Sequence, residues 1–116
     1  MNVYDAAHQM AKALKESDEC KKMMNAKAAL STDAEASKMV KDFLAKQIEL
    51  EIEVMSGKPV DPAKQENLQK LFDLLSLNEK SREYMQAYTR FQIMMKDIEK
   101  IIGEAVRPIL SELKDE

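Results

Sequence analysis

Asp5 and His8 are the residues best placed for metal chemistry, because they lie three positions apart near the start of the chain. On a helix that spacing puts both side chains on one face, where they could reach one ion. A di-metal site in a helical bundle, however, takes Glu-x-x-His motifs from two helices, and this chain has one histidine. A Ser-His-Asp triad would need the same His8 and a G-x-S-x-G turn, which the sequence lacks. We therefore expect no metal site and no catalytic residue here.

Cys20 is the only cysteine and could in principle be a redox or metal-binding thiolate. One cysteine cannot form an internal disulfide, and without a histidine partner it cannot build a structural zinc site or hold a cluster within one chain. The sequence therefore predicts no cofactor. The absence of a cysteine framework is typical of the reducing cytoplasm, which is where we expect the protein to be.

Two pairs of carboxylates are four positions apart and so share a helix face: Glu49 with Glu53, and Glu79 with Glu83. General acid and base catalysis needs carboxyl groups in a cleft, in environments that push their pKa values apart. A solvated face with neighbouring lysines is the more common context. We predict that the chain is not an enzyme. The alternative is a metal-binding protein or an enzyme that uses Asp5 and His8.

Lys96, Lys100 and Arg107 form a modest basic edge near the end of the chain. The formal net charge is −3, whereas nucleic-acid binding normally takes a basic patch or stripe. A weak RNA binder is thus an alternative, and nucleic acid is not the expected partner. The apolar runs are far shorter than the roughly 18 to 20 residues that span a bilayer, and no secretory signal is visible. We expect no membrane association.

The composition predicts an all-α protein, because glycine and proline are scarce and residues that favour helix are abundant. A chain of 116 residues has the usual size of one domain, so residues 1–116 are treated as a single helical domain. Helix-capping residues divide it into four or five helices of an antiparallel bundle, at Asn2, Ser17, Asp61 and Asn78.

A long helix is predicted to begin at Thr32, because Thr32 and Glu35 have the capping-box spacing. Gly57 marks its end. Residues 48–54 within it alternate strictly between apolar and acidic side chains, which taken alone is typical of a half-buried strand. A single strand would have no second strand in the chain to pair with, so we favour the helix.

That helix would carry two apolar stripes at about 100° per residue. Ile48, Ile52 and Met55 form one stripe, and Leu50 and Val54 form another. A four- or five-helix monomer of this length can cover one stripe, but covering both leaves few helices for the remainder. Soluble monomers seldom keep an exposed apolar patch. We therefore predict a homodimer in which these five residues form the self-association surface.

The last helix has a sustained heptad pattern, in which apolar residues recur at steps of four and three. The positions are Tyr84, Tyr88, Phe91, Met95, Ile98, Ile102, Ala105 and Ile109. This periodicity predicts that Phe91 belongs to the core. Met-rich surfaces can adapt to different partners, and Met23 and Met24, on the short second helix, are the candidates for a partner surface.

The order and spacing of several segments resemble the YheA branch of the YlbF/YmcA family of small bacterial helical proteins. The likeness extends over nearly the whole chain. It is carried by residues 2–8 (Asn-Val-Tyr-Asp-Ala-Ala-His), residues 13–17, Phe43, Gln47 and Glu49, Gly57, residues 84–87 (Tyr-Met-Gln-Ala) and residues 97–102.

The resemblance implies a helical bundle with one long helical hairpin that assembles into dimers or larger oligomers. The relatives YlbF and YmcA act without catalysis of their own, in a complex with YaaT that modulates ribonuclease Y and so affects messenger RNA processing and development. They are associated with iron–sulfur clusters held by cysteines. Because this chain offers Cys20 alone, the cluster is not expected here. The expectation is a non-enzymatic adaptor that binds other proteins, with a ribonuclease Y-associated complex as the partner that the resemblance implies.

Overall fold

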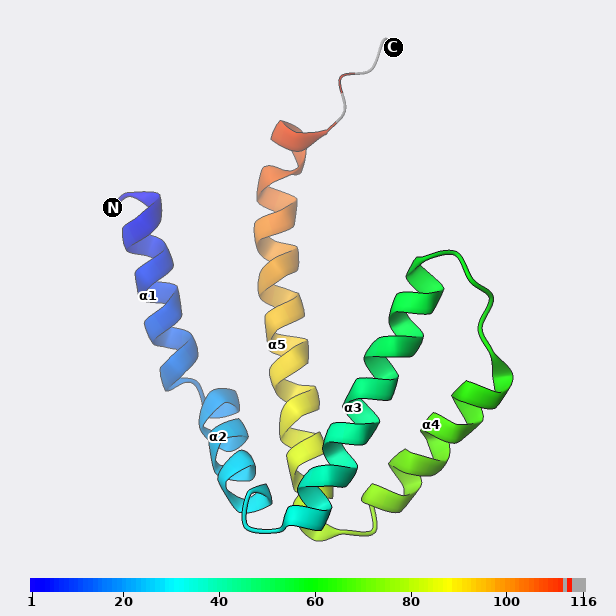
Figure 1. The fold of residues 1–116 in the computed structure, drawn as a ribbon. Coiled ribbons are helices and arrows are strands. Elements are labelled where there is room, and N and C mark those ends of the chain that lie inside the picture. The colour runs from blue at the N-terminus through cyan, green and yellow to red at the C-terminus, as the bar shows by residue number, and fades with distance from the viewer. Residues whose placement is uncertain (112, 114–116) are drawn as a thin grey trace.

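Five α-helices account for most of the chain in a computed structural model that describes residues 1–111 and 113, and no strand occurs among those residues (Figure 1). The helices are α1 (Val3–Glu16), α2 (Asp18–Leu30), α3 (Ala34–Met55), α4 (Pro62–Leu75) and α5 (Glu79–Leu110). The all-α prediction is confirmed. Residues 48–54 lie within α3, so the helical interpretation of the alternating segment is also confirmed.

The helices meet at one end of the molecule, here called the base, and diverge toward the other (Figure 1). α1 and α2 run toward the base, α3 runs away from it, α4 returns, and α5 leaves it again. α3 and α4 form the expected helical hairpin. The molecule measures 52 × 39 × 15 Å and has a radius of gyration of 18.4 Å. A compact domain of this length would have about 13 Å, so the bundle is flat and open.

The buried core lies at the base, where α2, α3, α4 and α5 come together. Its members are Leu30, Ala36, Val40, Phe43, Leu75 and Met85. The Phe43 ring also contacts Phe72, with ring centroids 5.6 Å apart, a separation that suits tilted aromatic pairs. Four of the five helices are therefore held together by one small cluster of side chains.

Each helix begins at a residue whose side chain accepts a hydrogen bond from the first turn. Asn2, Ser17, Asp61 and Asn78 act in this way, as the sequence predicted. These bonds satisfy backbone N–H groups that have no partner inside a helix. α4 also has Pro62 at its first position, where the missing N–H of proline costs nothing.

The predicted start of α3 at Thr32 is wrong by one residue. Asp33 is the N-cap, and its Oδ1 accepts from the backbone N–H of Ala36 at 3.0 Å. The Thr32 hydroxyl instead donates to the Ala29 carbonyl at 2.6 Å, which satisfies an acceptor at the end of α2. With Thr32 occupied in closing α2, the neighbouring carboxylate begins α3.

Asp33 also joins the two turns of the base. Its Oδ2 accepts from Asn78 Nδ2 at 3.4 Å, and Lys80 Nζ donates to Thr32 Oγ1 at 2.7 Å. The hydrogen bond from the Ala36 N–H lowers the pKa of Asp33, and Asn78 and Lys80 act in the same direction. The α2–α3 and α4–α5 turns are therefore tied by polar contacts beside the apolar core.

The last helix is buried only over its first half. Ser81, Met85 and Ala87 are buried, and Phe91, which was expected in the core, is only half-buried. From residue 96 to residue 110 nearly every side chain is exposed, because the other helices diverge from α5 toward this end (Figure 1). Among the described residues, no helix is long and apolar enough to cross a membrane.

Candidate protein-interaction surfaces

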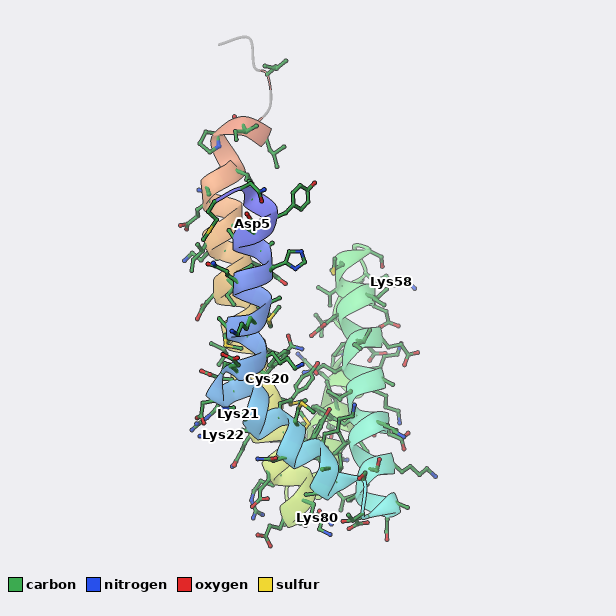
Figure 2. The ribbon with its side chains drawn as sticks, turned by 90° about the vertical axis from the view of Figure 1, so that its left-hand side faces the viewer. Asp5, Cys20, Lys21, Lys22, Lys58 and Lys80 are labelled. Carbon is green, nitrogen blue, oxygen red and sulfur yellow. The ribbon has the colours of Figure 1, made fainter. Side chains whose placement is uncertain are left out.

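Asp5 and His8 are both exposed on α1, and the backbone N–H of Asp5 donates to Asn2 Oδ1 at 2.8 Å. Figure 2 shows Asp5 near the free end of α1, whereas Cys20 lies beyond the joint between α1 and α2. Within the residues that the structure describes, no three His, Cys, Asp or Glu side chains are grouped so that they could hold a metal ion. The chemistry-bearing residues of the first two helices are therefore spread along the chain.

Glu49 and Glu53 do not form a joint site on α3. Glu53 accepts a hydrogen bond from Lys64 Nζ of α4, and this bond is the main reason that the pKa of Lys64 is raised. Glu49 is exposed, as are Glu79 and Glu83 on α5. The contact between Glu53 and Lys64 joins α3 to α4 and is a structural role. It involves only Glu53 of the Glu49–Glu53 pair.

The outer stripe of α3 is the first exposed apolar surface. Ile48, Ile52 and Met55 share one face, and 60% of Ile52 and 86% of Met55 are exposed. The helical spacing places Glu49 on one edge of this stripe and Glu51 on the other. We call this surface, consisting of Ile48, Ile52 and Met55, the α3 outer stripe.

The inner stripe of α3 is partly covered by α4. Leu50 is half-buried and lines a small hollow together with Lys64 and Asn67 of α4. Val54 is still 46% exposed. The five residues predicted for self-association thus divide into an outer stripe that is largely exposed among the described residues and an inner stripe that the hairpin covers in part.

The second exposed apolar surface is on α1. Its apolar stripe consists of Val3, Ala7, Met10 and Leu14, of which only Leu14 is even half-buried. α1 makes its main contact with α2, next to their joint at Ser17. An amphipathic helix normally turns such a stripe toward a core, and here the helix stands away from the core (Figure 1).

The far half of α5 is the third such surface. Ile98 is half-buried, whereas Ile101, Ile102 and Ile109 are exposed, at 67%, 48% and 78% respectively. Together with the first helix it forms a region that extends from the base without a core of its own (Figure 1). We call α1 and residues 94–110 of α5 the arm.

The sequence did not indicate an open groove of about 950 Å³ that lies beside α2, α4 and α5. Phe72, Met85 and Ala29 line it, and Arg82 and Arg90 are among its charged residues. Phe72 packs against Phe43 on one side, yet it is 40% exposed. The apolar face of α4 is therefore only partly covered by the neighbouring helices.

Met23 and Met24 are differently placed on α2. Met23 is half-buried, and Met24 is exposed. Neither lines the groove or belongs to the α3 outer stripe. The structure therefore leaves Met24 available to a partner but does not join the two methionines to the larger apolar surfaces.

The sequence of the chain was compared with those of known proteins and protein families. The model of the family described as "Control of competence regulator ComK, YlbF/YmcA" matches residues 3–107. A UPF0342 protein of Desulfitobacterium hafniense is 39% identical over 110 residues, covering 95% of this chain and 89% of the relative. A UPF0342 protein of Caldicellulosiruptor saccharolyticus is 41% identical over 115 residues, covering 99% and 92%.

A third relative, a UPF0342 protein of Symbiobacterium thermophilum, is 38% identical over 104 residues, which cover 90% of this chain and 93% of the relative. The likeness therefore includes all five helices, the arm as well as the base. With a family match from residue 3, at the start of α1, to residue 107, near the end of α5, this chain belongs to the YlbF/YmcA family.

Proposed function

We propose that this protein is a non-enzymatic regulatory adaptor that acts by binding other proteins through exposed apolar helix faces. The observation that carries the proposal is the α3 outer stripe, where Ile48, Ile52 and Met55 are uncovered on a well-formed helix. Monomeric soluble proteins rarely leave large contiguous apolar patches uncovered unless they bind something. The family description, which names the control of a competence regulator, supports a regulatory role.

The edges of the α3 outer stripe indicate the chemistry of the partner. Glu49 and Glu51 lie on its two sides. Two copies packed stripe to stripe would bring carboxylates together along both edges, which is unfavourable. The stripe therefore suits a protein partner whose apolar face has basic residues beside it. By resemblance to YlbF and YmcA, a ribonuclease-associated complex in RNA processing is the partner class that we propose.

The proposal includes self-association as a homodimer. The α3 outer stripe and the arm are both uncovered in one chain, and a chain that exposes more than one apolar face commonly buries one of them against a second copy. The five α3 residues Ile48, Leu50, Ile52, Val54 and Met55 remain one predicted surface for this role, and the arm is the other candidate.

A matched pair of variants tests partner binding. Ile52→Asp places a charge in the α3 outer stripe, and Ile93→Asp makes the same change on α5, at a residue that is similarly exposed, 55% against 60%. Tagged wild-type protein and both variants are cross-linked in the native cell, and the captured proteins are quantified by mass spectrometry. We expect Ile52→Asp to lose its partners at least tenfold and Ile93→Asp to retain them.

Circular dichroism shows whether each variant is folded before the capture is compared. If folded Ile52→Asp retains every partner of the wild type, the α3 outer stripe is not the binding surface. If the captured partners include a ribonuclease or its associated proteins, the RNA-processing part of the proposal is supported.

A further inference from the structure

We propose that α1 of one copy packs antiparallel on residues 94–110 of α5 in a second copy, and that the second copy returns the same contact. This inference rests on the proposed homodimer and assigns its interface to the arm. It concerns a surface whose apolar side chains are nearly all exposed and whose first helix packs mainly against α2. The occupant is a second copy because each half of the contact is already present in every chain.

The two stripes of the arm match in spacing. On α1 the apolar residues follow steps of four, three and four: Val3, Ala7, Met10 and Leu14. On α5 the same steps are repeated: Ile98, Ile102, Ala105 and Ile109. Aligned in opposite directions, the stripes pair in order, as the core positions of an antiparallel coiled coil do.

The sizes of the paired residues are compatible as well. In this register Val3 meets Ile109, Ala7 meets Ala105, Met10 meets Ile102, and Leu14 meets Ile98. The pair of alanines lets the helices approach closely near the middle, and larger side chains fill the space on both sides. Such alternation of small and large residues is what close packing of two helices needs.

The edges of the contact add further complementarity. Beside the α1 stripe, Ala13 offers a small surface at the level of Ile101, which is 67% exposed in one chain. On the other edge Lys15 comes to the level of Glu99, an opposite-charge pair that favours this register over its neighbours. The arm therefore avoids the like-charge contact that two copies of the α3 outer stripe would make.

The joint at Ser17 holds α1 away from the α5 of its own chain. The Ser17 N–H and hydroxyl both donate to the Leu14 carbonyl, at 3.1 Å and 2.6 Å. The same Ser17 Oγ accepts from the Cys20 N–H at 3.1 Å. This residue ends α1 and begins α2, so swinging α1 onto its own α5 would disturb the caps of both helices.

The area of the contact favours a reciprocal arrangement. α1 has 14 residues and is about 21 Å long at 1.5 Å per residue, so a face about 10 Å wide covers only about 200 Å². Each copy in the reciprocal contact contributes α1 and the far half of α5. The two copies together then approach the roughly 1,000 Å² that a specific interface needs, and four helices surround a new core.

Sedimentation tests the assignment to the arm. Ile102→Asp places a charge in the middle of the proposed contact, and Ile93→Asp is the matched control on the opposite side of α5. At tens of micromolar we expect the wild type and Ile93→Asp to have the mass of two chains and Ile102→Asp half that mass, with the helix content of the wild type. A folded Ile102→Asp that stays dimeric overturns the inference.

Disulfide trapping tests whether α1 contacts α5 of a second copy or α5 of its own chain. In a Cys20→Ser background, one chain carries Ala7→Cys and a second chain, with a tag that changes its mass, carries Ala105→Cys. After mixing and mild oxidation we expect a covalent pair of one chain of each kind. A third protein carries both cysteines in one chain, and it should give intermolecular products.

The outcomes separate the possible failures. If the doubly substituted chain forms an internal disulfide as a monomer, α1 closes on its own α5 and the inference is overturned. If the wild type is a dimer but the mixed disulfide does not form, the homodimer stands and the interface is elsewhere. If the wild type is a monomer, self-association fails, while partner binding by the α3 outer stripe is still decided by its own capture experiment.

Discussion

The base and the arm have the same kind of sequence and opposite environments. Both consist of amphipathic helices with apolar residues at steps of three and four. At the base these residues form the buried cluster around Val40, Phe43 and Leu75, whereas on α1 they are almost all exposed. The difference teaches that periodicity identifies which face of a helix is apolar and leaves open what covers that face. At the base, the apolar faces are covered by other helices of the same chain.

Removing a core side chain at the base should have the largest effect on the free energy of unfolding. Phe43 is 5% exposed and packs against Phe72. We expect Phe43→Ala to lower the free energy of unfolding by about 3 to 5 kcal/mol, as for other emptied aromatic core sites. Urea denaturation measures the change. Ile93→Ala, at an exposed position, is the control and should stay within about 0.5 kcal/mol; equal effects of the two would mean that the base is not the core.

A charge in the arm should instead change how the thermal midpoint depends on protein concentration. If a second copy covers the arm, the thermal midpoint of the wild type rises with protein concentration, because dimer formation stabilises only the folded chains. We expect Ile102→Asp to abolish this dependence and to leave the midpoint of dilute protein nearly unchanged. Scanning calorimetry over a hundredfold range of concentration measures both. A midpoint that falls equally at every concentration would place Ile102 in the chain's own core.

The two glycines should respond to alanine with opposite signs. Gly57 follows α3 with φ of +91°, a left-handed conformation that side chains disfavour, and Gly103 is inside α5 with no atom near the place of a Cβ. We expect Gly57→Ala to destabilise the protein by about 1 kcal/mol and Gly103→Ala to stabilise it by about 0.5 to 1 kcal/mol. Denaturant unfolding of both variants decides, and a stabilising Gly57→Ala would contradict the turn at the end of α3.

Lowering the pH should destabilise the folded protein at its base, where Asp33 joins two turns. Its pKa in the folded protein is lowered from the ordinary 3.8, chiefly because the carboxylate accepts the Ala36 N–H. A lowered folded pKa stabilises the protein above the unfolded value, and this contribution is lost as the pH falls through the folded value. Asp33→Asn keeps a capping side chain without the titration, so stability measured at pH 7 and pH 3 should fall less in the variant. An identical loss in both proteins would exclude Asp33 as the cause.

The smallest effect is expected at the single histidine. His8 is exposed on the arm and lies outside its apolar stripe. We expect His8→Ala to change the free energy of unfolding by less than about 0.5 kcal/mol and to leave bound metal at background in elemental analysis. Stoichiometric zinc or iron in the wild type that disappears in the variant would instead support the metal-binding alternative.

Local chemistry made the helix boundaries predictable. Asn2, Ser17, Asp61 and Asn78 cap helices as expected, because each bond joins residues two or three positions apart. The prediction that α3 begins at Thr32 failed for a reason that is also local. Thr32 and Asp33 could each cap α3, and the Thr32 hydroxyl bonds to the end of α2 instead. Local preferences decide such choices only when one candidate is present.

Burial was harder to predict, because it depends on contacts between residues far apart in the sequence. Phe91 and Ile102 follow the same heptad as Tyr84, yet their exposure increases along α5 as the other helices diverge. Phe72 likewise lies on an apolar face that no neighbour fully covers. The sequence indicated the apolar stripes of α3 and α5, and the directions of the helices determined which parts of them are available to partners.

The packing of α2 against α5 has a consequence for the order of folding. This contact is the most extensive in the molecule, yet α2 ends at Leu30 and α5 begins at Glu79. The α3–α4 hairpin joins neighbours in the chain and closes a short loop, whereas bringing α2 to α5 closes a loop of roughly 50 residues and costs more entropy. Formation of the hairpin first brings the ends of that loop together and reduces the cost. We therefore expect the local hairpin to form early in folding and the α2–α5 contact to form late.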